Sequence, residues 1–325
     1  MEKRILPFSI EVEMQTYLSG CFSLGAIKSC IVDYDVWLCN KLINCNSPRK
    51  HIGYWNTEDE DLWSTKDGCT FHQLINIAPE SVGVEGLDII KFNIEMIKRG
   101  YYVSGNYNEF YIPGASFFSK RDMSHGYILW GFDNQEQIFK SATYLSDGTY
   151  GQLDIKYDDY FKAVINNCQK LVPINYYRVD SSYKAKIDVE LVKSQLRDYM
   201  ASTCSLGVNS RRVYGVDVWE SLVNYVTTIQ GEPLDLRYIR AFMEHKVIMH
   251  KRIMTLTRFS YIHDCNMASE YNERVCDPAK QVFSMAIKYN ITHNADLLIR
   301  IADKIRSVNL CEQKYLLEML VQIEK

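Results

Sequence analysis

The chain has 325 residues, of which 47% are apolar and 24% are charged, and its formal net charge is -3 from 37 basic and 40 acidic side chains. These values are typical of a globular protein and argue against a chain that is mainly disordered. Because the charge creates no strong basic field, we do not expect nucleic acid as the main partner. The length exceeds what one core usually holds, so we expect two domains.

The sequence also bears on membrane and compartment. No apolar run reaches the length of about 18 residues that a membrane-spanning helix needs, so we expect no membrane partner. Near the start, Glu11 and Glu13 interrupt the stretch where a signal peptide requires its apolar core. The ten cysteines include no CxxC pair, which argues against zinc-ribbon and thioredoxin-like sites. We therefore expect a cytoplasmic protein whose cysteines are mostly buried thiols.

The first half mixes the patterns of strands and helices. Residues 8–14 alternate apolar and acidic, as a strand does, and residues 21–32 have helical spacing behind Ser19, an expected N-cap. A loop-rich stretch over 44–70 precedes an amphipathic helix over 86–99. A further helix is expected over 160–167. Strands are expected over 101–107, 127–132, 137–144, 150–157 and 171–180.

Beyond about residue 184 the pattern is helical throughout. Four aspartates stand at expected N-caps, namely Asp188, Asp217, Asp235 and Asp277. Helices are expected over 188–202, 216–229, 236–258, 278–289, 295–307 and 312–324. The sequence therefore predicts an α+β domain over 1–184, followed by an all-helical domain over 185–325.

The most informative short stretch contains Gln15 and Cys21. The glutamine precedes by six positions a cysteine that opens the helix expected over 21–32, which is the local layout of papain-like thiol enzymes. The unpaired amides of a first helical turn favour a thiolate over a thiol. The Cys21 amide and the Gln15 side chain could both donate to a developing oxyanion. The alternative is a buried cysteine and a surface glutamine without a catalytic role.

His125 is the candidate base for this thiol. It opens a hydrophobic strand, and a neutral imidazole at that place can take the proton of a thiol and return it to a leaving group. The alternative is a histidine at a strand edge without a role. The order, Cys21 first and His125 later in the same half, favours a thiol catalyst.

Other candidates carry less weight. His245 and His250 lie five positions apart on one expected helix, whereas pairs of metal ligands prefer three or four. No glycine-rich phosphate loop occurs, and we expect neither a metal nor a tightly bound cofactor. Four basic residues are expected on a solvated helix face, or alternatively as a docking patch for an acidic partner: Lys246, Lys251, Arg252 and Arg258.

Several stretches fall in the order of a known family: YLSGCFSLGAIKSC, YIPGASFF, SHGYILWGFDNQEQIFKSATYLSDGTY and VYGVDVWESL with LDLRYIRAFMEHKVIMHKRIMTL. The chain resembles the butirosin-biosynthesis protein H N-terminal-type family, papain-like proteins found beside nonribosomal peptide and polyketide genes. The resemblance covers most of the chain and is sharpest around Cys21, around His125 and in the helical stretch that begins at Asp235.

This resemblance implies a papain-like cysteine-protease-type domain that moves an acyl group from a carrier-protein thioester to an amine. Cys21 would be the nucleophile and His125 the base. The acyl, aminoacyl or peptidyl group would arrive on the phosphopantetheine arm of an acyl or peptidyl carrier protein. A small-molecule amine would accept the group.

One position departs from the family pattern. Relatives commonly carry an acidic residue where this chain has Thr143, whose hydroxyl can hold the imidazole Nδ1 but supplies no charge. Asp133, Asn134 or Asp147 could substitute for the acid. Three interpretations stay open: an acyltransferase, a cysteine hydrolase that uses the same residues, and an interaction scaffold that has lost its activity.

Overall fold

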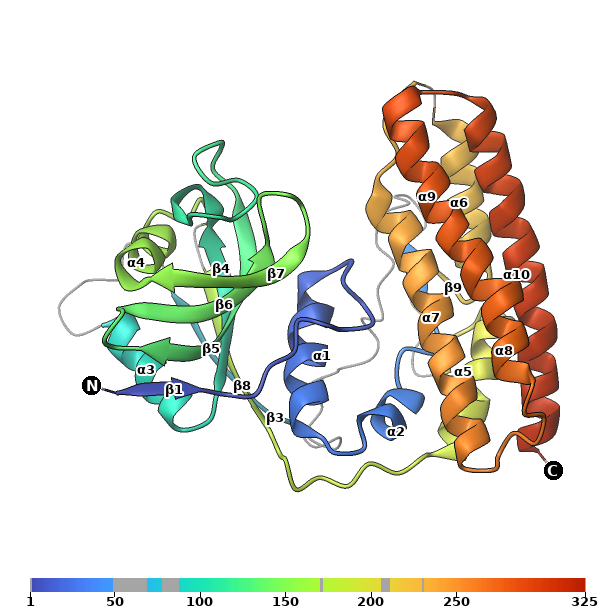
Figure 1. Cartoon of the computed structure of the whole chain (residues 1–325), viewed down its shortest axis with the longest axis horizontal. Helices are drawn as coiled ribbons and strands as arrows, with labels where there is room; N and C mark the ends of the chain where they lie inside the picture. The colour runs from blue at the N-terminus through green and yellow to red at the C-terminus, as the bar shows by residue number, and fades with distance from the viewer. Residues whose placement is uncertain are drawn as a thin grey trace. The chain divides into compact units, whose positions relative to one another are not determined.

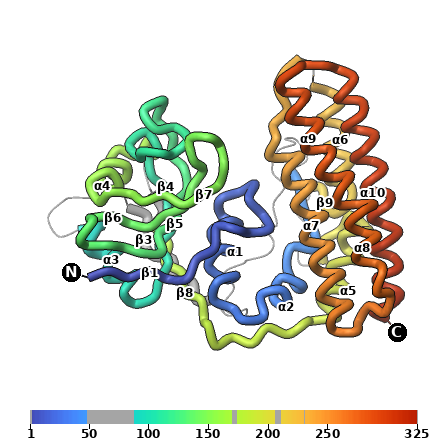
Figure 2. Tube along the Cα trace, viewed as in Figure 1, coloured from blue at the N-terminus to red at the C-terminus, as the bar shows by residue number. Residues whose placement is uncertain are grey.

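The chain folds into two compact units. The computed structural model describes residues 2–48, 69–77, 88–169, 172–205, 211–229 and 231–324. The first unit comprises Met1–Val32 and Leu62–Lys184, and the second comprises Asp33–Asp61 and Ala185–Lys325 (Figures 1 and 2). The expected division after residue 184 is therefore one of several points at which the chain passes between units, because the segment after Val32 packs with the helices.

The first unit is built on an antiparallel sheet with the strand order β3-β8-β4-β5-β6-β7, and β1 pairs with β5 (Figure 1). The strands are β1 Lys3–Ile5, β3 Cys69–Ile77, β4 Tyr102–Asn108, β5 Ser124–Asp133, β6 Ile138–Tyr144, β7 Tyr150–Lys156 and β8 Val172–Val179. The expected hairpin is confirmed, since β5 pairs with β6 and β6 with β7. This sheet places the head of β5 between its neighbours β4 and β6.

Helices of the first unit are α1 Leu18–Cys30, α3 Ile89–Lys98, α4 Tyr157–Ile165 and the short 3₁₀ helix η3 Glu109–Tyr111. Buried hydroxyls tie two helices to the sheet. The Tyr160 hydroxyl of α4 lies 2.6 Å from the Tyr127 hydroxyl of β5, and the Tyr176 hydroxyl of β8 donates to Asn93 of α3 at 3.0 Å. Helix α1 approaches β5 closely at Gly126, where a Cβ would lie 3.4 Å from the Phe22 ring. This contact places α1 against β5 at the residue that follows His125.

The expected strand over 8–14 is wrong, and α1 explains the alternation that suggested it. Lys28 of α1 forms a 3.0 Å ion pair with Glu13, while Val12 and Met14 are buried. The acidic and apolar residues thus alternate because the segment lies against a helix rather than a neighbouring strand. Of the loop expected over 44–70, residues 49–68 lie outside the described parts of the chain.

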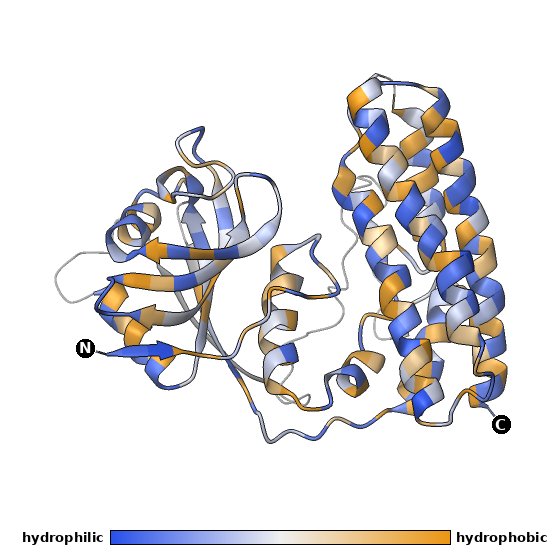
Figure 3. Cartoon of the chain, in the orientation of Figure 1, coloured by the Kyte–Doolittle hydropathy of each residue, from blue (hydrophilic) through white to orange (hydrophobic). Residues whose placement is uncertain are grey.

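The second unit is mostly helical. Its helices are α2 Tyr34–Cys39, α5 Val189–Met200, α6 Asp217–Thr228, α7 Leu236–Arg258, α8 Met267–Tyr271, the π-helical turn η4 Asn272–Cys276, α9 Asp277–Thr292 and α10 Asp296–Ile323. The expectation of an all-helical domain is wrong in one respect, because β2 Asn46–Pro48 pairs with β9 Arg212–Tyr214. Figure 3 shows hydrophilic and hydrophobic residues interspersed around α9 and α10, as in amphipathic helices.

The ends of these helices test the expected caps. The N-cap roles of Asp188 and Asp235 are confirmed, since their side chains accept hydrogen bonds from backbone N–H groups in the first turns of α5 and α7. Asp217 and Asp277 instead lie one position inside their helices. The two helices expected over 295–307 and 312–324 form the single helix α10, because neither glycine nor proline stands between them. Within the described parts of the chain, no helix has the length and apolar character needed to cross a bilayer.

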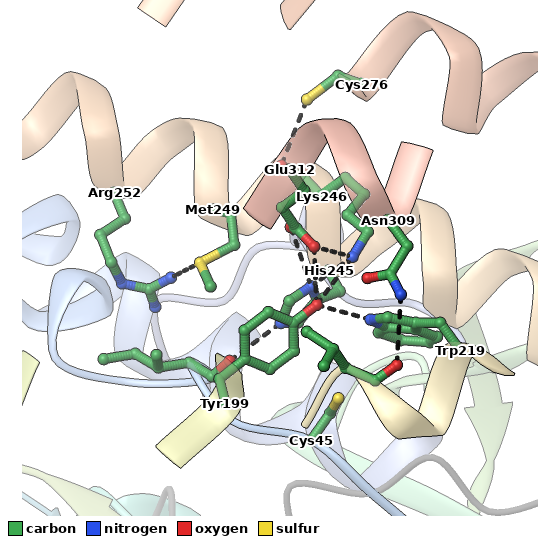
Figure 4. A network of polar contacts seen from close by, with 12 residues as sticks. Cys45, Tyr199, Trp219, His245, Lys246, Met249, Arg252, Cys276, Asn309 and Glu312 are labelled. Atoms are coloured by element: carbon green, nitrogen blue, oxygen red, sulfur yellow. Dashed lines mark hydrogen bonds and ion pairs between the residues drawn. The ribbon is translucent and has the colours of Figure 1, made fainter. Parts of the chain in front are cut away.

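A buried ionic cluster joins α7 to α10 (Figure 4). The Nζ atom of Lys246 lies 2.5 Å from the Glu312 carboxylate, and both side chains are 0% exposed. The Tyr271 hydroxyl donates to this carboxylate at 2.7 Å, and the Tyr199 hydroxyl does so at 2.8 Å. Trp219 Nε1 donates in turn to the Tyr199 oxygen at 2.6 Å. Burial of a charge is costly unless such partners are present, and here they surround both charges.

Buried side chains of α7 also hold the segment after Val32. The ring nitrogen Nε2 of His245 lies 3.0 Å from the Ile43 carbonyl oxygen, so this nitrogen carries the proton. Arg252 donates through Nε to the Cys39 carbonyl at 2.9 Å. Burial lowers the pKa of His245 to about 3, and the neighbouring Lys246 charge adds to this effect. These bonds explain why residues 33–48 belong to the helical unit.

The neutral state of His245 predicts a loss of stability in acid. The unfolded imidazole takes up a proton as pH falls below 6.5, whereas the buried one does not until about 3. The free energy of unfolding should therefore decrease as the pH is lowered from 6.5 to about 3, by up to about 1.4 kcal/mol per pH unit. His245→Gln can still donate to the Ile43 carbonyl and should flatten this dependence. Urea titrations of both proteins at about pH 7 and about pH 5 measure the difference; parallel profiles would contradict it.

Candidate functional site

His125 has a buried carboxylate as its partner. The Nδ1 atom of His125 lies 2.8 Å from Oε1 of Glu109, and the two side chains are 29% and 0% exposed. Glu109 opens η3 directly after β4. Antiparallel pairing sets Tyr107 of β4 opposite His125 of β5, so the residues just after β4 stand beside the head of β5. The pair therefore results from the register of two strands.

The Glu109 carboxylate is held by donors from two further places in the chain. The Thr143 hydroxyl donates to Oε1 at 3.2 Å, and the Phe117 backbone N–H donates to Oε2 at 3.3 Å. A buried carboxylate needs such hydrogen bonds. Since the carboxylate accepts, Nδ1 of His125 carries the hydrogen in the neutral ring, and Nε2 is left as the basic nitrogen.

Thr143 has a different place from the one expected. Its hydroxyl donates to Glu109, and the backbone oxygen of Gly126 lies 3.4 Å from it. It therefore supports the carboxylate that orients His125, rather than holding the imidazole Nδ1 itself. Of the acids considered as substitutes, Asp133 forms an ion pair with Lys3 at 2.9 Å.

Sequence reasoning missed Glu109 because it searched for the acid after the histidine. The sequence did contain a usable signal. Glu109 is an acidic residue just after the strand expected over 101–107, and an acid at the end of a strand that neighbours His125 can reach the imidazole. Pairing that strand with the one that begins at His125 brings Glu109 beside the imidazole. Only the choice of strand partner was lacking, and strand order is not encoded locally.

Cys21 lies in the first turn of α1. This helix begins at Leu18 with Tyr17 as its N-cap, so the expected cap at Ser19 is wrong. The Cys21 backbone N–H donates to the Tyr17 carbonyl at 3.1 Å. That amide is therefore engaged within the helix and not directed at an oxyanion, contrary to expectation. Cys21 is 0% exposed.

The segment before α1 is tied to the His125 region through Tyr144. The Tyr144 hydroxyl lies 2.7 Å from the backbone oxygens of both Gln15 and Thr16. Its ring centroid is 5.6 Å from that of His125. Gln15 donates through Nε2 to the Ile10 carbonyl at 3.4 Å. The backbone of Gln15 is thus placed at the site, and its expected role as an oxyanion donor stays a prediction.

Tyr150 connects Cys21 to the same region. It opens β7 opposite Tyr144 of β6, and the two rings meet edge to face with centroids 6.4 Å apart. Within the parts of the chain that the structure describes, the Tyr150 hydroxyl is buried without a hydrogen-bond partner. Burial raises the pKa of Tyr150 well above its usual value, and the nearby Cys21 adds to this increase. The Tyr150 phenol is therefore protonated near neutral pH and lies within electrostatic reach of the thiol.

The expected basic patch on α7 is not a single solvated face. Lys246 and Arg252 are 0% and 1% exposed, so they belong to the core of the second unit. Lys251 and Arg258 line a cavity of about 310 Å³ together with Asp35, Met254 and Thr255. Two of the four expected charges therefore remain near the surface, beside a carboxylate of opposite sign.

Comparisons with known proteins add no assignment. No protein-family model matches the chain. A search of curated proteins found no match. Among the residues that the structure describes, no group of three or more His, Cys, Asp or Glu side chains is arranged to hold a metal ion. The chemistry of the site follows from the side chains around Cys21 and His125.

Proposed function

We propose that the chain is a cysteine-dependent acyltransferase with a papain-like first unit, in which Cys21 is the nucleophile and His125 is the base. The observation that carries this proposal is the 2.8 Å contact between His125 Nδ1 and the buried Glu109 carboxylate. A carboxylate on Nδ1 keeps Nε2 free to accept a proton and stabilises the imidazolium that results. Glu109 supplies the charge that Thr143 cannot.

The reaction has two halves with the same base. In the first, His125 takes the Cys21 proton, and the sulfur attacks the carbonyl carbon of a carrier-bound thioester. The pantetheine sulfur leaves and takes the proton from His125, so that an acyl-enzyme thioester remains. In the second, an amine attacks this thioester, its proton passes to His125, and Cys21 is released. Exchange between thioesters is nearly neutral in free energy, so general-base help of about 10²–10⁴-fold is adequate.

Access to the thiol requires a local opening. Cys21 has no exposed surface, whereas the His125 side chain is 29% exposed. Openings of this kind are common at sites built from loops and helix ends. The pantetheine arm of an acyl or peptidyl carrier protein is long and narrow, which suits entry to a covered thiol.

Hydrolysis by the same residues is the second candidate. The two reactions differ only in whether an amine or water reaches the acyl-enzyme, and the same Cys21 and His125 serve either acceptor. The third interpretation, a scaffold without activity, is disfavoured by Glu109. A carboxylate without solvent exposure is costly to bury, and its position on Nδ1 of a partly exposed histidine has a clear catalytic use.

The test follows the acyl group by intact mass. The full chain is incubated with an acylated carrier protein, with and without an added amine. We expect an acyl adduct on the wild type, none on Cys21→Ala, and an unchanged adduct on the matched control Cys168→Ala, which removes an exposed thiol of the same unit. An amide product indicates transfer, and a free acid alone indicates hydrolysis. Equal turnover by Cys21→Ala and wild type would overturn the proposal.

A further inference from the structure

The Cys21 amide is unavailable as an oxyanion donor, because its N–H bonds to the Tyr17 carbonyl at 3.1 Å. The attack of Cys21 on a thioester nevertheless places a negative charge on the former carbonyl oxygen. Such charge is stabilised by donors that are already in place when the reaction begins. The site therefore needs a donor from elsewhere in the first unit.

We propose that the Tyr150 hydroxyl donates a hydrogen bond to this oxyanion, an inference that rests on the function proposed above. Tyr150 pairs across the sheet with Tyr144, whose hydroxyl contacts the Gln15 and Thr16 carbonyls and whose ring lies 5.6 Å from that of His125. Tyr150 thus neighbours Tyr144, the residue that contacts both the segment before α1 and the ring of His125.

The Tyr150 hydroxyl is free for this task. It is buried and has no hydrogen-bond partner among the described residues, although a buried polar group without a partner destabilises the fold. Since no residue that the structure describes bonds to this hydroxyl, a bond made only in the reaction is consistent with its position. A contrasting case is Tyr160 of α4, whose hydroxyl receives a 2.9 Å bond from Asn93 and lies 2.6 Å from Tyr127.

The donor keeps its proton throughout the reaction. Because the pKa of Tyr150 is raised, the O–H remains a donor near neutral pH and does not exchange roles with His125. The hydrogen bond forms as the C–O bond becomes single and charge develops on its oxygen. It weakens when the C–O double bond returns and the pantetheine sulfur leaves with the proton from His125.

Tyr150→Phe tests the donor, because it removes only the oxygen atom. We expect acylation by the carrier thioester to slow by about 10²–10³-fold in kcat with little change in KM. The thermal midpoint should stay equal or rise, since an unpaired hydroxyl is lost. Alkylation of Cys21 by iodoacetamide should be unchanged, because that reaction forms no oxyanion.

The matched variant Tyr160→Phe should show the reverse, with normal acylation and a lower thermal midpoint. Wild-type acylation by Tyr150→Phe, while Cys21→Ala is inactive, would overturn the donor role and leave the proposed function intact. A slow Tyr150→Phe that is also destabilised or alkylated more slowly would assign a structural role and overturn it as well. Equal activity of Cys21→Ala and wild type would instead remove the proposed function itself.

Discussion

Glu109→Gln should lower kcat for acyl transfer by about 10²–10⁴-fold, or roughly 3–5 kcal/mol of transition-state stabilisation. Oε1 of Glu109 now accepts from His125 and Thr143, and Oε2 accepts from the Phe117 N–H. A glutamine has one oxygen and one NH₂ group, so it cannot accept on both sides. Placing its NH₂ toward the imidazole puts the proton on Nε2 and removes the base. Placing the NH₂ toward Phe117 sets it against the Phe117 N–H, which is also a donor, and leaves an uncharged oxygen at the imidazole.

Steady-state kinetics with an acylated carrier protein measure this effect. The control Thr143→Val removes a single donor to the carboxylate and should reduce kcat much less than Glu109→Gln does. Circular dichroism and thermal midpoints of both variants show whether a loss of activity comes from the catalytic step or from unfolding of the protein. A Glu109→Gln variant that folds normally and retains wild-type kcat would show that the carboxylate does not orient a catalytic base.

Glu312→Ala should destabilise the second unit by about 3–5 kcal/mol, and lower its thermal midpoint by roughly 6–20 °C. The variant leaves Lys246 buried without the carboxylate that lies 2.5 Å from its Nζ atom. It also removes the acceptor of the Tyr199 and Tyr271 hydroxyls. The loss is large because several buried groups become unpaired together, rather than because one ion pair is strong.

Two controls distinguish this cause from a general effect of mutating α10. Glu318 is exposed on the same helix, so Glu318→Ala should change stability by less than about 0.5 kcal/mol. The double variant Lys246→Met with Glu312→Leu replaces both charges by apolar side chains. Its loss in free energy of unfolding should be smaller than the sum of the losses of the two single variants. Additive losses in chemical denaturation would contradict a coupled buried cluster.

Local patterns predicted much of the fold. The hairpin from β5 through β7, helix α3 and most helices of the second unit follow from alternation, helical spacing and turn residues. The pattern over 8–14 misled because burial against a helix can imitate the period of a strand. The pairing of β2 with β9 could not be predicted, since these three-residue strands are far apart in sequence and too short to show a pattern.

The candidate site shows the same limit. Cys21 and His125 were found because each opens an element with a recognisable pattern. Glu109 was missed because its role depends on the neighbour of β5, which is a property of the whole sheet. The Cys21 amide is engaged because α1 begins at Leu18, three residues before the expected start at Cys21, and the exact first residue of a helix lies beyond what a sequence pattern resolves.

The position of residues 33–48 has a consequence for how this protein can be divided. A fragment of the protein that contains only 185–325 lacks the two backbone oxygens to which α7 bonds, those of Ile43 and Cys39. It also lacks β2, the strand that pairs with β9. During synthesis, these early residues leave the ribosome long before the helices that receive them. The second unit is therefore assembled from two segments that lie far apart in the sequence, and a single cut after residue 184 would separate them.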